Sequence, residues 1–224
     1  MIHVENISRT YDMHGAEVRA LDGVSLHVDP GEFIAITGPS GSGKSTLLNV
    51  LGCLDRPDAG SYVLDGQEVS RLDDEAISTV RNRKIGFIFQ SFHLLPRLTV
   101  LENVMLPLRF TREPKPDVTA RAKELLTRVG LADRMDHRPT QLSGGQMQRA
   151  AIARSLILSP ALLLADEPTG NLDSKSAADV LNLLDELHAQ GQTIVLVTHD
   201  NDIAAHAPRH VRLRDGKVES DAKR

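Results

Sequence analysis

The chain has 224 residues, of which 41% are hydrophobic and 25% are charged, and its formal net charge is −4 at pH 7. This length suits one large domain or a domain with an inserted subdomain, and the composition excludes a disordered or fibrous protein. The slight acidic excess and the aromatic content of 3% argue against nucleic acid or anionic lipid as a partner.

Cysteine usage and hydropathy point to a compartment. Cys53 is the one cysteine, so no internal disulfide is expected, and a reducing environment fits. No apolar run approaches the roughly 20 residues of a membrane span. Residues 1–10 lack the basic and then apolar pattern of a secretory signal. We therefore expect a soluble chain on the cytoplasmic side.

The first ninety residues are predicted to form mainly strands. Alternating apolar positions over residues 2–29 indicate two strands with one wet face, and the apolar run at residues 33–37 is typical of a buried parallel strand. Further expected elements are a helix at residues 46–54, a hairpin at residues 61–69 that turns at Asp65 and Gly66, a helix at residues 73–83 and a strand at residues 85–89.

The rest of the chain alternates helices with short apolar strands. Residues 91–142 are predicted to be a mostly helical insert, with helices at 99–108 and 118–129 around a loop at 112–117. The expected C-terminal elements are helices at residues 144–158 and 174–190 and near Ile203, strands at 161–166 and 193–198, a hairpin at 211–218 and frayed residues at 220–224. This alternation predicts an α/β core.

Residues 38–46 read GPSGSGKST and satisfy the pattern of a phosphate-binding loop. Glycines let backbone N–H groups wrap around an anion, and the following helix adds the positive end of its dipole. A ligand-free turn is disfavoured because the motif follows a buried strand and opens a helix. We expect Lys44 to reach the β- and γ-phosphates of a nucleotide, Ser45 to bind Mg²⁺ and Thr46 to lie near the α-phosphate. The expected binding residues are Gly38, Pro39, Ser40, Gly41, Ser42, Gly43, Lys44, Ser45 and Thr46.

Asp166 and Glu167 end a second apolar run, ALLLADE. Ligands bind at the carboxyl edge of such strands, where Asp166 could hold Mg²⁺ and Glu167 could orient and polarise an attacking water. An ordinary acidic pair at a strand end is the alternative, and the phosphate-binding loop argues against it. Phosphoryl transfer needs both a phosphate clamp and a carboxylate for the metal.

Gln90 and His199 each follow a predicted strand. The amide of Gln90 could contact both Mg²⁺ and the attacking water, and the imidazole of His199 could donate to a γ-phosphate. Either residue alone would more simply be structural. A role for both residues in nucleotide binding is favoured because the same sheet carries the phosphate-binding loop.

The sequence LSGGQ at residues 142–146 places a hydroxyl and two bare backbone amides at the start of a long helix, as in a second anion site. One nucleotide does not need two such sites on one chain. A homodimer would explain this feature if each chain covered the nucleotide of the other. A helix N-terminus without a ligand explains it about equally well.

Taken together, these motifs resemble the ATP-binding-cassette ATPases over nearly the whole chain. The resemblance rests on residues 38–46, Gln90, residues 142–146, the Asp166–Glu167 pair, residues 171–173 (NLD) and His199, in that order. It implies a P-loop NTPase core of RecA-like topology, an antiparallel β-subdomain and an inserted helical subdomain.

The resemblance also implies ATP and Mg²⁺ as cofactors and a head-to-tail dimer with two ATP molecules at its interface. Tyr11 corresponds to the aromatic residue that stacks on adenine. Asp173 would lie near the partner chain. The residues implied at the second site are Ser143, Gly144, Gly145 and Gln146.

A narrower resemblance, to the macrolide-exporter and lipoprotein-release (MacB/LolD) type, rests on residues 51–57, 89–108 and 166–173. It implies an ATPase subunit at the cytoplasmic face of the inner membrane, attached through a permease on a separate chain. The helical insert would contact that permease, and Phe92, Leu94, Leu95 and Leu98 are either subdomain core or part of a groove for a permease helix.

Two other functions fit the sequence less well. A cassette ATPase that acts on nucleic acid or ribosomes would carry a long coiled coil or a second cassette. A P-loop kinase or GTPase would leave the second glycine site unexplained, and the Asn-Lys-x-Asp base reader of GTPases is absent from the sequence. Cys53 is expected to be a small core residue, and Pro208 disfavours a metal site at His206 and His210.

Overall fold

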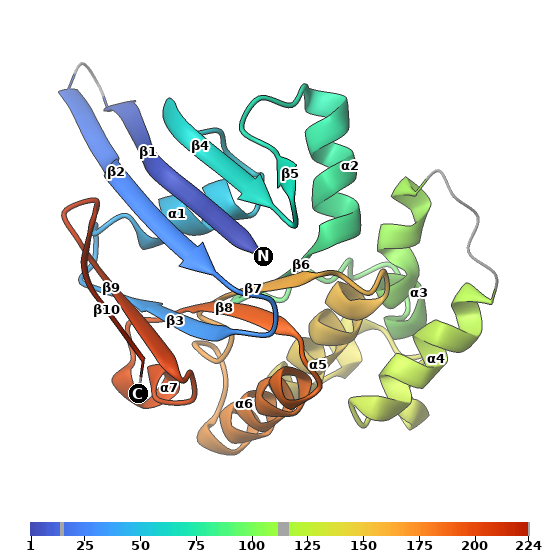
Figure 1. The fold of residues 1–224 in the computed structure, drawn as a ribbon. Helices are drawn as coiled ribbons and strands as arrows, with labels where there is room; N and C mark the ends of the chain where they lie inside the picture. Colours follow the sequence, from blue (N-terminus) through green and yellow to red (C-terminus); the bar gives the residue numbers. More distant parts are fainter. Residues whose placement is uncertain (14–15, 112–116, 224) are drawn as a thin grey trace.

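A computed structural model describes residues 1–13, 16–111 and 117–223. In these ranges the strands form two sheets, and the helices pack mainly on one of them (Figure 1). The four-stranded sheet has the order β2-β1-β4-β5 and is antiparallel, with β1 at Ile2–Met13, β2 at Ala16–Val28, β4 at Ala59–Leu64 and β5 at Gln67–Glu68.

The six-stranded sheet has the order β10-β9-β3-β8-β7-β6 and is parallel except for its edge strand β10. Its strands are β3 at Phe33–Thr37, β6 at Ile85–Phe89, β7 at Leu162–Asp166, β8 at Thr193–Val197, β9 at Arg209–Arg214 and β10 at Lys217–Lys223. The carboxyl ends of β3, β7 and β8 therefore lie at one edge, where ligands bind in sheets of this kind.

Two hydrophobic cores lie on the two faces of this sheet. Along β3 the side chains alternate, so that Phe33 and Ala35 enter the core under the helices while Ile34 and Ile36 enter the core between the sheets. Both cores need apolar residues at every position of the central strands. This explains why those strands are nearly continuous apolar runs.

The helices divide between the two cores. The helix α1 (Lys44–Leu51) lies between the two sheets, and α5 (Gly144–Leu156) and α6 (Ser174–Ala189) cover the opposite face of the larger sheet (Figure 1). The other α-helices are α2 at Asp74–Lys84, α3 at Val100–Met105, α4 at Val118–Arg128 and α7 at Asn201–Ala204, and short 3₁₀ helices occupy Leu106–Phe110, Ala132–Arg134 and Pro139–Gln141.

The predicted α/β class and the order of elements are confirmed. The helix expected at residues 46–54 instead spans Lys44–Leu51, because Gly52 ends it and Cys53 has a φ of 53°. Cys53 is buried as predicted, although it lies just beyond the helix, and burial raises the pKa of its thiol to about 11. The loop predicted at residues 112–117 lies outside the described residues except for Asp117, which precedes α4 with a φ of 55°.

Two further expectations about local structure need correction. The helix predicted at residues 99–108 changes from α to 3₁₀ at Leu106, where Pro107 lacks the N–H that would continue it. Residues 220–223, expected to fray, pair with β9 as part of β10. The Arg209 guanidinium reinforces this pairing by bonding both Asp221 carboxylate oxygens, and Lys223 ties β10 to Glu32, just before β3.

Candidate functional site

The loop between β3 and α1 contains three glycines with positive φ: Gly38 (147°), Gly41 (77°) and Gly43 (99°). Two of them also lie against backbone oxygens. A Cβ atom on Gly38 would be 2.2 Å from the Leu213 oxygen, and one on Gly43 would be 2.3 Å from the Ala20 oxygen. Glycine is therefore required at these positions by both conformation and space.

The loop places a lysine beside an uncapped helix start. Lys44 Nζ donates to the backbone oxygens of Gly38 (2.9 Å) and Pro39 (2.8 Å), so the ammonium group folds over the loop. The buried Ser42 hydroxyl has no hydrogen-bond partner among the described residues. No side chain in that part of the chain caps the first turn of α1. Free donors around a cation at a helix start form a binding site for phosphate.

Two hollows adjoin at the loop and share Ser40, Lys44 and Ser45 in their walls. We call them the Tyr11 hollow, which has a volume of about 550 Å³, and the Glu167 hollow, which has a volume of about 530 Å³. The remaining residues of the Tyr11 hollow are Tyr11, Val18, Arg19, Ala20, Gly41, Gly43, Thr46 and Asp215. Those of the Glu167 hollow are Thr37, Gly38, Pro39, Asp166, Glu167, Val197, His199, Asn201 and Arg212.

The Tyr11 ring is fixed by its neighbours. Its hydroxyl donates to Asp55 Oδ2 at 2.6 Å, and the Arg9 guanidinium lies over the ring at 4.9 Å from the centroid. Arg9 in turn pairs with Asp55 and Asp58. One face of the ring is thus occupied by a cation, and the side chain is pre-oriented where it lines the hollow.

Glu167 is the most constrained acidic residue of the site. Its carboxylate accepts hydrogen bonds from the His199 backbone N–H (2.9 Å) and from the Thr198 hydroxyl (3.0 Å), and its Oε1 lies 2.6 Å from His199 Nδ1. Its φ of 44° is unusual for a residue other than glycine. The side chain is 17% exposed, against 77% for His199, so the imidazole faces the open hollow while the carboxylate lies beneath.

Asp166 ends β7 beside Glu167 in the same hollow as Ser45 and Lys44. Burial and the neighbouring Glu167 charge raise the pKa of Asp166, and Lys44 offsets this only in part. A hydroxyl and a carboxylate in the same hollow fit Mg²⁺, which takes oxygen ligands and few protein groups. Within the described ranges, no cluster of three or more histidine, cysteine or acidic side chains that could hold a metal ion is found.

Gln90 lies outside the walls of both hollows. Its amide Nε2 donates to Asn171 Oδ1 at 3.3 Å, and Asn171 Nδ2 donates to the Gln90 backbone oxygen at 3.1 Å. The following residues, Phe92 and His93, have φ values of 55° and 50°. Arg154 bonds both of their backbone oxygens, so the segment after Gln90 is held in a strained conformation by one half-buried guanidinium.

The LSGGQ segment forms a regular helix N-terminus rather than an open cradle. Ser143 caps α5: its hydroxyl accepts from the Gln146 N–H (3.3 Å), and Gln146 Oε1 accepts from the Ser143 N–H (2.9 Å). None of Ser143, Gly144, Gly145 or Gln146 lines either hollow in the described part of the chain. This segment is therefore not brought to the phosphate-binding loop of its own chain.

Asp173 is an exposed residue that caps the neighbouring helix α6. Its carboxylate accepts from the Ser176 N–H (3.0 Å) and the Ser176 hydroxyl (2.7 Å), and these bonds lower the pKa of Asp173. A Cβ on Gly145 would lie 2.5 Å from the Ser176 hydroxyl oxygen. Gly145 is thus needed for close packing of α5 against the start of α6.

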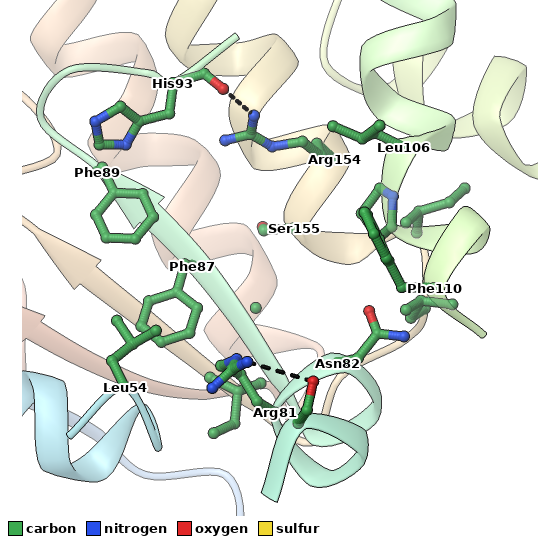
Figure 2. Close-up of a pocket in the computed structure, with 16 residues that line it drawn as sticks. Leu54, Arg81, Asn82, Phe87, Phe89, His93, Leu106, Phe110, Arg154 and Ser155 are labelled. Atoms are coloured by element: carbon green, nitrogen blue, oxygen red, sulfur yellow. Dashed lines mark hydrogen bonds between the residues drawn. The ribbon is translucent and has the colours of Figure 1, made fainter. Parts of the chain in front are cut away.

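A third pocket, of about 570 Å³, lies between β6, α2, α5 and the 3₁₀ helix at Leu106–Phe110 (Figure 2). We call it the Arg154 pocket. Phe87, Phe89 and Leu106 give it apolar walls, and Phe110 at its rim is 72% exposed. Its floor adjoins the segment after Gln90, because Arg154 bonds His93 there. Of the residues proposed as a groove or subdomain core, Leu94 packs on the core and Leu95 is exposed.

Sequence reasoning missed several residues of the two hollows. Arg212 and Asn201 line the Glu167 hollow, and Arg19 and Asp215 line the Tyr11 hollow. Arg212 lies on β9, which is hydrogen-bonded to β3 beside the loop. Its outward position in an alternating strand was the available signal. Asp55 had no signal, because its contact with Tyr11 joins segments that are 44 residues apart.

Comparison with known proteins gives consistent results. Residues 21–170 match the family described as ABC transporter. An uncharacterised ABC transporter ATP-binding protein of Thermotoga maritima is 52% identical over all of this chain and 96% of its own length. A macrolide export ATP-binding/permease protein MacB of Chlorobaculum tepidum is 50% identical, and the chain spans 34% of that protein.

The solved structures include a dimeric structure of the bacterial ABC transporter cassette MJ0796, with a TM-score of 0.91 and 46% identity over all of this chain and 98% of the other. The same cassette in a post-hydrolysis dimer bound to ADP and Pi also has a TM-score of 0.91, at 45% identity over the same shares of both chains. These matches support the transporter assignment rather than the alternative of an ATPase acting on nucleic acid or ribosomes. Within the described ranges, no helix has the length and hydropathy to cross a bilayer.

The fold, the phosphate-binding loop and the matches together establish this chain as a member of the ABC transporter family, as an ATP-binding subunit that hydrolyses ATP.

Proposed function

We propose that one MgATP occupies both hollows, with its triphosphate along the loop that they share. The observation that carries this proposal is the common wall of Ser40, Lys44 and Ser45, which joins an aromatic ring on one side to an acid–imidazole pair on the other. Tyr11 then stacks on the base with the ring face that Arg9 leaves open. The backbone of residues 38–43 and Thr46 bind the phosphates, and Lys44 moves from its carbonyl partners to the β- and γ-phosphates.

Mg²⁺ would be held by Ser45 and Asp166, with Gln90 reaching it after leaving Asn171. When bound, the ion neutralises charge on the phosphates. The protein side of the reaction lies with Glu167, which orients and polarises the attacking water. His199 holds the carboxylate in place through Nδ1 and presents its other ring nitrogen to the γ-phosphate.

The second half of each site comes from a second copy of the chain. Ser143, Gly144, Gly145 and Gln146 lie away from both hollows of their own chain, and the helix N-terminus that they form is a binding surface for a γ-phosphate. Asp173, next to Ser176 and Gly145, would lie near the partner's site. The dimeric cassette structures support this arrangement. Homodimerisation on ATP is therefore part of the proposal.

The test is the variant Glu167→Gln. The amide keeps the shape of the carboxylate but cannot polarise water as a base, so turnover falls by at least about 100-fold, at the lower end for a lost general base. ATP binding persists, and light scattering on a sizing column with MgATP should show a stable dimer. Glu186→Gln, an exposed change on α6, is the matched control and keeps wild-type turnover. A monomeric Glu167→Gln protein under saturating MgATP would refute the composite site.

We also propose that the chain drives an integral-membrane permease on a separate polypeptide and lies on the cytoplasmic face of the inner membrane through it. The MacB relative, whose name includes a permease, is about three times as long as this chain, whereas the Thermotoga relative has nearly the same length. Export, efflux or lipoprotein release are the transport processes that fit. Residues 91–142 form the helical subdomain in this proposal.

The Arg154 pocket is the surface that we assign to the permease (Figure 2). It is apolar, it lies at the helical subdomain, and Arg154 links its wall to the segment that follows Gln90. Phe110→Asp places a charge at its exposed rim and should abolish co-purification with the permease while basal ATPase activity stays unchanged. Ala189→Asp, an exposed change at the end of α6, should retain the complex. Retention by Phe110→Asp would contradict this assignment.

A further inference from the structure

His3 and His27 lie opposite one another on the exposed face of the four-stranded sheet. They are direct register partners in the antiparallel pair β1–β2, and the residues on either side of each point into the core. Their side chains are 49% and 55% exposed. Cross-strand partners have neighbouring Cβ atoms, so the backbone itself brings the two imidazoles together.

The two rings meet through the same nitrogen. His3 Nδ1 lies 3.1 Å from His27 Nδ1, and the rings are inclined at 73°. Each Nε2 has a carboxylate partner on its own strand: His3 Nε2 lies 2.9 Å from Glu5 Oε1, and His27 Nε2 lies 3.0 Å from Asp29 Oδ1. All four ring nitrogens therefore have a specific neighbour.

The hydrogen atoms of two neutral imidazoles cannot satisfy all four of these contacts, so a cation is needed between the rings. An ionised carboxylate only accepts, so both Nε2 atoms must carry the hydrogen, and a neutral imidazole has no second one. Two neutral rings would then direct lone pairs at each other across 3.1 Å. The conflict is removed by a positive charge between the two Nδ1 atoms, either an added proton or a metal ion.

The distances suit a metal ion. With Zn–N bonds of about 2.0–2.1 Å and a tetrahedral angle, two imidazole nitrogens on one zinc are about 3.3 Å apart. That is within about 0.2 Å of the separation of the two Nδ1 atoms. Metal-binding histidines usually donate their other N–H to a carboxylate, which fixes the tautomer and raises the basicity of the ligand. Glu5 and Asp29 provide both of these partners.

We propose that His3 and His27 form a two-imidazole site for a divalent transition-metal ion of the zinc class on the outer face of β1 and β2. The protein supplies two ligands, and water completes the coordination shell, because the described residues contain no cluster of three or more such side chains that could hold a metal. The site binds more weakly than a four-ligand structural zinc site. It is independent of the nucleotide site, since neither histidine lines the Tyr11 or the Glu167 hollow.

The site is tested by titrating the untagged full chain with Zn²⁺ in a calorimeter, with no nucleotide present. We expect a site of one-to-one stoichiometry that His27→Ala and His3→Ala each weaken by at least tenfold. Asp29→Ala removes a carboxylate that bonds only His27 among the described residues, and it should weaken the site by about 10-fold or more through the loss of the outer partner. His206→Ala, an exposed histidine paired with Asp185, should leave it unchanged.

Two results would overturn the proposal. One is that no Zn²⁺ binding that depends on the two histidines is detected at Zn²⁺ concentrations up to about 1 mM, the weakest affinity of interest. A shared proton would then be the cation between the rings. The other is binding lost in His3→Ala but kept in His27→Ala, which would show that His27 is not a ligand of the ion. Nitrogen NMR of the imidazoles gives an independent check, since Zn²⁺ should shift Nδ1 and leave the hydrogen on Nε2 in both rings. Circular dichroism of each variant confirms that the sheet is intact.

Discussion

The two glycine-rich segments of this chain look alike in sequence and differ in structure. In the loop at residues 38–43, glycines take positive φ values and leave the Ser42 hydroxyl without a partner in the described residues. At residues 142–146, the glycines are helical, and Ser143 and Gln146 satisfy each other. The first segment leaves the start of α1 without a side-chain cap. The second is complete as local structure, so any ligand it binds must come from outside its own chain.

Lys44→Ala tests the first segment and should have the largest effect. The variant loses two charge-assisted contacts to phosphate, each worth about 1.5–3 kcal/mol, so nucleotide affinity should fall by about 100-fold or more. Fluorescent-nucleotide titration measures this change. Lys217→Ala, which removes an exposed lysine paired with Asp22, is the control and should bind normally. Unchanged affinity of Lys44→Ala would contradict the role of this lysine as the phosphate clamp.

Ser143→Arg tests the second segment, with an effect on turnover alone. The long cation cannot fit between a γ-phosphate and the helix start, so turnover should drop by about 100-fold, the size seen when a preorganised charge-stabilising group is lost. Nucleotide affinity of the monomer should stay within about twofold, since Ser143 lies outside both hollows.

The control for Ser143→Arg is Thr140→Arg, which adds the same charge at an exposed position just before the segment. Ser143→Ala separates the loss of the helix cap, about 1 kcal/mol of stability, from the steric effect. If Ser143→Arg hydrolyses ATP at the wild-type rate, the second segment has no part in the site.

Much of this comparison could be predicted from sequence, because each motif combines a local pattern with a position at a strand or helix end. Residues 33–37 and 85–89 were assigned as the strands they form, since buried parallel strands are continuous apolar runs bounded by turn residues. The separation of Ser143 from Lys44 was not predictable from spacing. It depends on how the helices pack on the sheet.

The errors of prediction have tertiary causes. Residues 220–223 are polar and look frayed, yet Arg209 draws Asp221 into β10 by a bidentate contact across the hairpin. The contact of Tyr11 with Asp55 likewise depends on the fold, because it joins β1 to the chain beyond α1. Local patterns predict elements, whereas the partners of charged side chains are decided by the assembled chain.

Gly43→Ala and Gly145→Ala compare how much each glycine-rich segment contributes to the free energy of unfolding. A Cβ on Gly145 meets the Ser176 side chain, at 2.5 Å from its oxygen, while a Cβ on Gly43 meets the Ala20 backbone at a positive φ. Gly145→Ala should cost about 1–3 kcal/mol by overpacking, partly offset by about 1 kcal/mol of helix propensity. Gly43→Ala should cost at least as much and also lose nucleotide binding.

Removing the clash distinguishes the two glycine variants. Ser176→Gly takes away the side chain that Gly145→Ala meets, so Gly145→Ala should cost less unfolding free energy, measured in urea, in the Ser176→Gly background than in the wild-type chain. No such rescue exists for Gly43→Ala, because its neighbour is a backbone oxygen. An equal cost of Gly145→Ala in both backgrounds would show that the spacing of α5 and α6 does not depend on this contact.

Asp55→Asn should have the smallest effect, because Asp55 acts on the nucleotide only through Tyr11. Loss of the hydrogen bond that orients the ring should cost about 0.5–1.5 kcal/mol of binding free energy, which lowers ATP affinity by roughly 2- to 12-fold. Tyr11→Phe removes the same hydrogen bond from the other side. If the hydroxyl acts through Asp55 alone, the double variant should be no weaker than the weaker single variant.

The charge of Asp55 also makes a prediction about acid stability. Burial raises its pKa, but hydrogen bonds from Tyr11, from the Arg56 backbone and from Arg9 lower it by more, so the pKa in the folded protein lies below the ordinary value of 3.8. Such a group stabilises the fold above pH 3.8, and the contribution is lost as the pH falls through the lower folded value. The stability gap between wild type and Asp55→Asn, measured by urea unfolding, should therefore be constant near neutrality and close in acid. A gap that widens on acidification would mean that Asp55 is not the ionised partner of Tyr11 and Arg9, and the ring would then have to be positioned by other contacts.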